Sequence, residues 1–384
     1  MIYKDLLYGS WELPDFIERL VHTTEMVRLR KISQVVLPNS IYPFGPMASR
    51  FQHGLGVCRL AMLVMENNPE LSEYTKKLPV AGLLHDAGNP ALSHLAEYFL
   101  RAMIGKDGES FLEDILKYSE TEKVLIETGL DVPQILGLIT GTLKPISTVL
   151  NGSMDIDNLD NVGRYAYAEN LDVDFDAMLI AESFKFNGTE WTLPAYIFDE
   201  AMKWKKARAT VYGNVYKEPN LVADTMIYRA VEIAYYQGKI DKNFFFLNDE
   251  QAIEYLREKC DLAVLRLVDK VTRWDWYKSA FRYETLYPSK KFADSANQKG
   301  KKELADKILN ALPISEEDVC VIISKGRDVR KITVPFVFPD GSRKYDEEEE
   351  RTIYRVRIYI SPEITEKKTI DIIEELVRHE LEII

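Results

Sequence analysis

Residues 82–94, GLLHDAGNPALSH, contain the most informative pattern in the sequence. It places the ionisable pair His85-Asp86 at the end of an apolar run that is typical of a buried helix. Gly88 and Pro90 end this helix, and a second helical period begins directly after them. Because charged side chains are costly to bury without partners, the sequence favours a functional pairing of His85 with Asp86.

Apolar residues spaced by three and four continue on both sides of this stretch, from about residue 12 to residue 285. After about residue 290 the pattern changes to β-branched runs such as DVCVIISKGR, an alternating segment RTIYRVRIYIS and a final helical segment. The sequence therefore predicts a mainly α protein. We expect the helical core over residues 1–285 and a smaller C-terminal α+β lobe over residues 286–384.

The composition, with 46% hydrophobic and 29% charged residues among 384, is typical of a globular protein. The net charge of −12 gives no general electrostatic reason to expect nucleic-acid binding, although the local basic segment KWKKAR keeps it open. Three distant cysteines argue against a disulfide framework and a zinc knuckle. Apolar runs fall short of the roughly 18–20 residues of a membrane span, and the first residues lack a signal-peptide pattern. We therefore expect a soluble cytoplasmic protein that does not bind membranes.

A hydrolytic metal site needs nitrogen and oxygen ligands around one cation, with a position open for water or substrate. The side chains that could supply them lie in three separate stretches: His53, the His85-Asp86 pair, and the carboxylates Asp155, Asp157 and Asp160. Such separation is expected for a site assembled between the helices of an all-α core. From the residues alone, Asp155 and Asp160 are equally well explained as helix caps or salt-bridge partners.

These stretches resemble the HD-domain phosphohydrolase superfamily, whose metal ligands follow the order His, His-Asp, Asp. The segments RLRKISQVVLPNSIYPFGPMASRFQHGLGV, HDAGNPALSH and MDIDNLDNVGRYA are similar to motifs of its dNTP triphosphohydrolase branch, which includes dGTPase-like and SAM-and-HD-domain enzymes. ADTMIYRAVEIA and LVDKVTRWDWYKSAF resemble later parts of the same core. The resemblance covers about residues 12–285 and implies a helical, metal-dependent hydrolase of nucleotides that assembles as a homo-oligomer.

The resemblance also implies which residues hold the metal. The ligands would be His53, His85, Asp86 and Asp157. Such a set suits one divalent transition metal, and the ligand types do not choose among Mn, Fe, Ni, Co and Zn. Mg²⁺ could accompany a nucleotide substrate.

Substrate and catalytic roles follow from the same resemblance. Arg50 would hold a phosphate, because a guanidinium suits bidentate phosphate contacts. Gln34 would contact the sugar hydroxyl. His94 would stand over the reacting phosphate as general acid or electrostatic stabiliser, and Glu97, one turn further on, would orient it. The α-phosphorus would then be attacked by a metal-activated water.

Three asparagines depart from the pattern of the branch. Asn158 stands where a basic residue is usual, Asn161 where tyrosine is usual, and Asn89 where a second histidine is usual. We expect Asn158 and Asn161 to line the substrate site. Two explanations stay open: the substrate carries fewer phosphates, or a substitute cation binds the triphosphate. The candidates for that cation are Lys205, Lys206, Arg208 and Lys217, of which Lys217 is the chosen one.

Three functions stay open at this point. The leading one is a dNTP triphosphohydrolase that releases a deoxynucleoside and inorganic triphosphate. The second is an HD phosphomonoesterase or nuclease acting on another phosphorylated substrate. The third is a regulatory protein that binds nucleotides without turnover, and the three asparagines keep it open.

Overall fold

The computed structural model describes residues 1–34, 41, 48–218 and 220–384. By contact, the chain divides into two compact units that interleave along the sequence. The first unit comprises residues 1–214, 245–250 and 331–347, and the second comprises residues 215–244, 251–330 and 348–384. This division differs from the expected boundary between residues 285 and 286, which stays a prediction.

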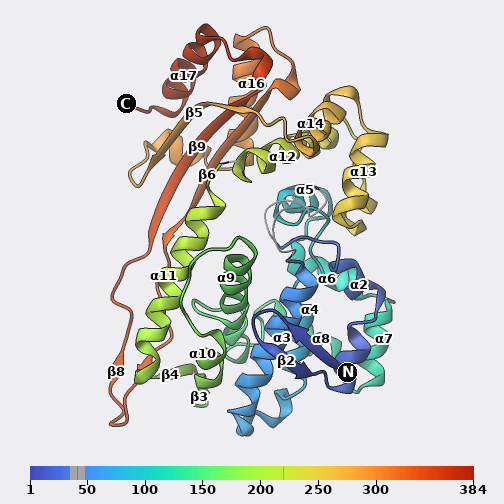
Figure 1. Ribbon diagram of the computed structural model, residues 1–384, viewed down its shortest axis with the longest axis vertical. Coiled ribbons are helices and arrows are strands. Elements are labelled where there is room, and N and C mark those ends of the chain that lie inside the picture. Colours follow the sequence, from blue (N-terminus) through green and yellow to red (C-terminus); the bar gives the residue numbers. More distant parts are fainter. Residues whose placement is uncertain (35–40, 42–47, 219) are drawn as a thin grey trace. The chain divides into compact units, whose positions relative to one another are not determined.

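The first unit is built mainly from helices joined by short connections (Figure 1). Its helices are α1 (Asp15–Leu20), α2 (Thr24–Leu29), α3 (Arg50–Glu66), α4 (Lys77–Leu84), α5 (His94–Ile104), α6 (Gly108–Leu116), α7 (Glu120–Glu127), α8 (Val132–Ile139), α9 (Ile156–Ala168), α10 (Ala177–Ser183) and α11 (Phe198–Val215), the last ending at the border of the second unit. Short 3-10 segments are η1 (Pro69–Tyr74), η2 (Ile146–Val149) and η3 (Ala195–Ile197).

Two small sheets accompany these helices. Strands β1 (Ile2–Asp5) and β2 (Gly9–Glu12) form an antiparallel hairpin at the N-terminus. A second sheet has the order β3-β4-β7-β8, in which β4 and β7 are parallel. Its strands are β3 (Lys185–Phe186), β4 (Trp191–Pro194), β7 (Phe336–Val337) and β8 (Arg343–Lys344). Strands β7 and β8 lie about 140 residues after β4 in the sequence but belong to the first unit.

Helices α3 and α4 form the buried centre of the first unit and approach each other closely. A capping box begins α3, in which Ser49 and Gln52 exchange hydrogen bonds between side chain and backbone. A Cβ atom added at Gly54 of α3 would lie 2.6 Å from the carbonyl oxygen of Leu83 in α4. Glycine at this position therefore lets the two backbones meet, and this brings the ends that carry histidines together.

The second unit contains a three-stranded antiparallel sheet of order β5-β9-β6. Its elements are α12 (Asn220–Tyr236), η4 (Lys242–Phe246), α13 (Asp249–Lys259), α14 (Leu262–Thr272), β5 (Lys278–Thr285), α15 (Lys290–Ser295), α16 (Gln298–Ala311), η5 (Glu316–Asp318), β6 (Val319–Val329), β9 (Arg351–Ile360), η6 (Pro362–Ile364) and α17 (Lys367–Leu381); the ends of η4 and α13 nearest residues 245–250 belong to the first unit. Side chains of α15, α16 and α17 share one apolar core with the sheet, including Phe292, Ile308, Ile358 and Val377. Strand β5 precedes residue 286, so this sheet draws on the range expected to be helical.

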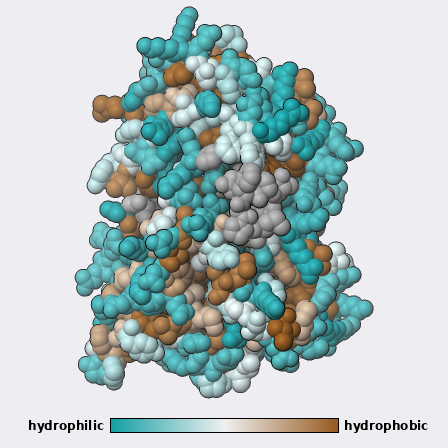
Figure 2. All heavy atoms as spheres, viewed as in Figure 1, coloured by the Kyte–Doolittle hydropathy of each residue, from teal (hydrophilic) through white to brown (hydrophobic). Residues whose placement is uncertain are grey.

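The prediction of a mainly α protein with a smaller α+β part is confirmed, since helices make up more than half of the described residues and the sheets are small. Figure 2 shows hydrophilic residues over much of the visible face, with hydrophobic residues scattered among them. Among the described residues, no helix is both long enough and apolar enough to cross a membrane.

Candidate metal centre

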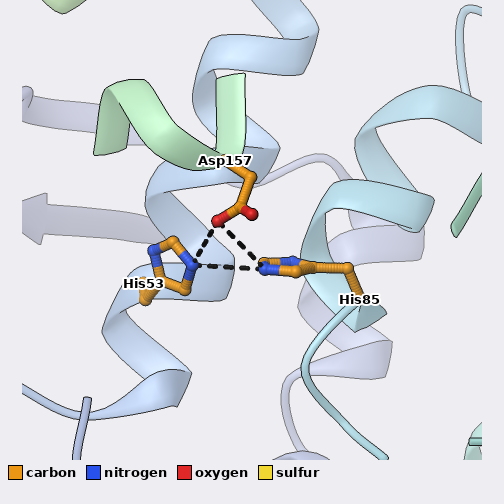
Figure 3. Close-up of side chains that lie close together, drawn as sticks. All are labelled: His53, His85 and Asp157. Atoms are coloured by element: carbon orange, nitrogen blue, oxygen red, sulfur yellow. Dashed lines mark hydrogen bonds and ion pairs between the residues drawn. The ribbon is translucent and has the colours of Figure 1, made fainter. Parts of the chain in front are cut away.

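Three of the predicted ligands lie together in the first unit. His53 comes from the first turn of α3, His85 directly follows the last residue of α4, and Asp157 lies in the first turn of α9. Their side chains point toward one another (Figure 3). His53 Nε2 is 3.0 Å from Asp157 Oδ1 and 3.2 Å from His85 Nε2, and His85 Nε2 is 3.5 Å from the same oxygen. Three potential donor atoms thus lie within 4.8 Å of one another and could hold a metal ion.

Asp86, the fourth predicted ligand, lies beside this cluster. Its Oδ2 is 3.7 Å from His53 Nε2 and 3.6 Å from His85 Nε2. The same oxygen accepts a hydrogen bond from Arg50 Nη1 at 2.5 Å, and Oδ1 accepts one from Asn89 Nδ2 at 2.5 Å. Asp86 therefore faces the two histidines while Arg50 and Asn89 hold it, and its role as a ligand stays a prediction.

Hydrogen bonds on the far side of each imidazole favour the tautomer that a metal needs. His85 Nδ1 donates to the carbonyl oxygen of Gly82 at 2.8 Å, and His53 Nδ1 donates to Asp160 Oδ1 at 2.7 Å. With the proton on Nδ1, the lone pair of each Nε2 points into the cluster. Two imidazole nitrogens and nearby carboxylates are a donor set that fits a divalent transition metal.

The charges in the cluster stabilise one another. Burial alone would lower the pKa of both histidines, but Asp157 together with Asp160 raises that of His53, and Asp86 together with Asp157 raises that of His85 to about 10. Burial alone would raise the pKa of Asp157, yet hydrogen bonds from the two histidines in their protonated form hold it well below its usual range. The carboxylates are thus charged at neutral pH, and a cation would take the place of the histidine protons.

A buried chain of charged groups supports His53 from behind. Asp160 accepts from Arg164 Nε at 2.9 Å and from Arg164 Nη2 at 2.8 Å, and Arg164 Nη2 also donates to Asp5 Oδ2 at 3.1 Å. Burial would raise the pKa of Asp160, but Arg164 and His53 outweigh it and lower the pKa. Asp155, by contrast, caps α9 by accepting from the backbone N–H of Asn158 at 2.7 Å. Of the two carboxylates with open roles, one is therefore a cap and the other an ion-pair partner.

The predicted substrate residues fall into separate groups. Gln34 Nε2 donates to Asn161 Oδ1 at 3.3 Å, so the structure brings these two together. Asn158 Nδ2 donates to Asp155 at 2.9 Å and takes part in the cap of α9. Arg50 Nε donates to Ser93 Oγ at 2.8 Å.

The four candidate substitute cations lie on α11 or directly after it. Lys205 forms an ion pair with Asp346 at 2.5 Å in the first unit. Arg208 lies over the ring of Tyr212, and Lys206 is exposed on the same helix, α11. Lys217 is exposed in the second unit, just after α11, so its role at the substrate site stays a prediction.

The predicted catalytic pair lies at the beginning of α5. His94 Nδ1 is 3.2 Å from Glu97 Oε2, and the His94 side chain is 79% exposed. The two residues before it, Leu92 and Ser93, have φ angles of 61° and 49°. Non-glycine residues rarely adopt this conformation, and such strain is concentrated at functional sites.

One carboxylate that sequence reasoning missed holds this strained turn. Asp249 accepts from the backbone N–H of Leu92 at 2.7 Å and from that of Ser33 at 2.8 Å. Asp249 lies 157 residues beyond Leu92, and its sequence context, NDEQ, is only typical of a helix start. Asp5 was missed for the same reason, because nothing in the sequence links it to Arg164.

Comparisons with known proteins found partial sequence matches. No family model matches the chain. The deoxynucleoside triphosphate triphosphohydrolase SAMHD1 homolog of Dictyostelium discoideum is 28% identical over 187 residues, which cover 43% of this chain and 36% of that protein. An uncharacterized protein of Methanocaldococcus jannaschii is 25% identical over 292 residues, which cover 73% of this chain and 58% of that protein. The chain thus spans less than two thirds of the length of each.

A solved structure matches over nearly the whole chain. A hypothetical protein from Aquifex aeolicus superposes with a TM-score of 0.75 at 18% identity, covering 98% of this chain and 99% of that one. At this identity the likeness shows a shared fold. The partial sequence matches, by themselves, support a distant relationship to HD-domain proteins of the dNTP triphosphohydrolase kind.

Proposed function

We propose that this protein is a metal-dependent phosphohydrolase of nucleotides, and most specifically a dNTP triphosphohydrolase that releases a deoxynucleoside and inorganic triphosphate. The observation that carries the proposal is the cluster of His53, His85 and Asp157, whose ring nitrogens are oriented for a metal. The similarity to proteins named as dNTP triphosphohydrolases supports the choice of substrate.

In this proposal a divalent cation held by His53, His85, Asp86 and Asp157 would lower the pKa of a bound water and polarise a phosphate oxygen. Mn²⁺, Fe²⁺, Ni²⁺, Co²⁺ and Zn²⁺ all suit such ligands, and Mg²⁺ could enter with the nucleotide.

The chain's own residues would position the substrate and move the proton. Arg50 is buried beside the cluster and is held by Asp86 and Ser93, so its guanidinium is oriented before a phosphate arrives. The exposed ring of His94, paired with Glu97, would donate a proton to the leaving oxygen or offset its charge. Gln34 and Asn161, which contact each other, would bind the sugar.

The three asparagines keep two other functions in view. Asn89 is hydrogen-bonded to Asp86 and Asn158 to the cap of α9, so neither replaces a phosphate-binding cation in the structure as described. A substrate with fewer phosphates, as in a phosphomonoesterase or nuclease, would need fewer cations. A regulatory protein would bind metal and nucleotide without turnover.

Product analysis tests these alternatives. Each of the four dNTPs is incubated with the protein and with Mn²⁺ or Mg²⁺, and anion exchange resolves the products. Deoxynucleoside with intact triphosphate is expected from the wild type and should be absent from His53→Ala and Asp86→Ala, which lose the metal. Release of phosphate or pyrophosphate would point to another phosphohydrolase, and bound but intact dNTP to the regulatory alternative.

His94→Ala separates catalysis from metal binding. This variant should retain the metal and lose at least about 100-fold in kcat, the typical contribution of a positioned acid. The matched control is His22→Ala, because His22 is also exposed and its Nδ1 hydrogen-bonds to the backbone carbonyl of Glu18. Full activity of His94→Ala would refute the role of His94.

Light scattering of the same protein samples tests the proposed homo-oligomer.

A further inference from the structure

We propose that Asp5, in the N-terminal hairpin, is a positioning residue for the metal centre, acting on His53 through Arg164 and Asp160. This inference rests on the metal site of the proposed function. It assigns to the hairpin β1–β2 a task in metal binding.

The chain of contacts is continuous from the hairpin to the cluster. Asp5 Oδ2 accepts from Arg164 Nη2 at 3.1 Å, Asp160 Oδ2 accepts from the same nitrogen at 2.8 Å, and Asp160 Oδ1 accepts from His53 Nδ1 at 2.7 Å. His53 Nε2, on the opposite side of the ring, faces Asp157 and His85. Each link in this chain is therefore a direct charge-assisted hydrogen bond.

Water cannot weaken these links, because all four side chains are buried. The exposed fractions are 1% for Asp5, 4% for Arg164, 0% for Asp160 and 3% for His53. In such surroundings a change of charge at one end is felt strongly at the next group. The chain can therefore carry an electrostatic effect from the hairpin to the imidazole.

The turn of the hairpin aims Asp5 at Arg164. Asp5 Oδ1 accepts from the backbone N–H groups of Leu7 at 2.8 Å and of Tyr8 at 3.2 Å, which leaves Oδ2 for the guanidinium. Asp5 pairs with Gly9 across the hairpin, and Gly9 has a φ of 69°, which suits glycine in a tight turn. The local sequence DLLYG thus orients the carboxylate without help from the helices.

Sharing of Arg164 between two carboxylates explains how Asp5 would affect the metal. While Asp5 takes part of the guanidinium's charge, Asp160 keeps more negative charge for the N–H of His53. That hydrogen bond makes the imidazole a stronger electron donor at Nε2. Without Asp5, Arg164 would bind Asp160 alone and draw charge away from His53, so the metal affinity would fall.

The test is a measurement of Co²⁺ affinity, by competition with a chromophoric chelator, on the full chain. Asp5→Asn keeps an acceptor for the turn but loses the negative charge toward Arg164. We expect the Kd for Co²⁺ to rise about tenfold, the lower end of the range for residues that support metal ligands. The matched control is Asp15→Asn, an exposed aspartate in the first turn of α1, and its Kd should equal that of the wild type.

Further measurements separate positioning from simple stabilisation. A purely structural role would lower the unfolding temperature of metal-free protein and leave the Kd of the folded protein unchanged, which would overturn the proposal. Asp5→Ser, whose hydroxyl can also accept from the turn N–H groups, serves if Asp5→Asn does not fold. In an Asp160→Asn background, Asp5→Asn should change the Kd no further, and equal effects in both backgrounds would contradict transmission through Asp160.

The assay also distinguishes this inference from the function on which it rests. If the wild type binds Co²⁺ and Asp5→Asn binds it equally well, only the role of Asp5 fails. If the wild type binds no Co²⁺, the proposed metal centre fails and the role of Asp5 with it. Neither result depends on the identity of the nucleotide substrate.

Discussion

At the scale of single residues, His53 shows how one side chain serves two partners. Its Nδ1 is engaged by Asp160 and its Nε2 faces Asp157 and His85. When both sets of contacts are made, the imidazole ring is fixed in a single orientation. The protein thus orients the His53 imidazole for metal binding before any metal binds.

Gly56 makes room for this arrangement. It lies one turn after His53 on α3, and an added Cβ would collide with Asp160 Oδ2 and Arg164 Nη2. No other residue type fits there without moving the pair that supports His53. Gly56 is visible in the sequence RFQHGLGV. The side chains that require a glycine there belong to α9, more than a hundred residues further along the chain.

Gly56→Ala should therefore weaken both folding and metal binding. Overpacking of this kind costs about 1–3 kcal/mol of unfolding free energy, and displacement of Asp160 should raise the Kd for Co²⁺. Urea unfolding of metal-free protein and the chelator competition measure the two effects. Gly213→Ala, in α11, is the control, because nothing lies within 4 Å of its added Cβ and its stability should be equal or slightly higher. Two indistinguishable variants would contradict the crowding at Gly56.

At the scale of elements, the turn between α4 and α5 is held by several distant parts of the first unit. Arg28 of α2 donates to the carbonyl oxygens of Ala87 and Asn89, and Asp249 accepts from the N–H of Leu92. These contacts hold two residues at positive φ directly before His94. The strain of the turn is thus balanced by hydrogen bonds from elsewhere in the chain.

Asp249→Asn should loosen this turn and leave the metal ligands in place. Leu92 donates to Oδ1 and Ser33 donates to Oδ2, and an amide has a carbonyl oxygen at only one of these two positions. One of the two buried N–H groups therefore loses its acceptor, which costs about 1–3 kcal/mol. We expect faster hydrogen exchange over residues 88–95, an unchanged Kd for Co²⁺ and a kcat lowered about tenfold, the effect of 1.4 kcal/mol.

The control for this experiment is Asp261→Asn. Asp261 precedes α14 and makes no side-chain capping hydrogen bond, and asparagine caps helices as well as aspartate does. Its exchange and kcat should match the wild type. Unchanged exchange of residues 88–95 in Asp249→Asn would show that the carboxylate does not hold the turn.

At the scale of the whole molecule, buried Asp249 makes stability depend on pH. Burial raises its pKa to about 6, although N–H groups of Ser33 and Leu92 act in the opposite direction. An unfolded aspartate titrates near pH 4, so the folded protein binds one more proton than the unfolded chain between about pH 4 and pH 6. This contribution to stability is complete below pH 4 and is lost as the pH rises through 6.

Comparison of the wild type with Asp249→Asn isolates this effect. The carboxylates of the metal centre titrate equally in both proteins and cancel in the difference. The unfolding free energy of the wild type minus that of the variant should decrease by about 2 kcal/mol from pH 4 to pH 7. Urea unfolding at a series of pH values measures it, and a difference independent of pH would mean that Asp249 titrates normally.

The division of the chain into units belongs to the same scale. Residues 245–250 and 331–347 join the first unit, although they are flanked by segments of the second. The change of pattern near residue 290 predicted an α+β part but not these returns, because periodicity describes each segment by itself. Strand β5 was missed for a related reason, since its eight residues directly follow a long helical pattern.

The helical class and the three stretches that carry His53, His85 and Asp157 could be predicted from the sequence, because amphipathic spacing and residue chemistry are local properties. The family resemblance had singled out Asp157 as a ligand, but the roles of Asp155 as a helix cap and of Asp160 as the support of a histidine came from the folded structure. Asp155, Asp157 and Asp160 lie within six residues on one helix, yet each has a different partner. Asp5 and Asp249 acquire their roles from groups far along the chain, and such pairings are set by packing in three dimensions.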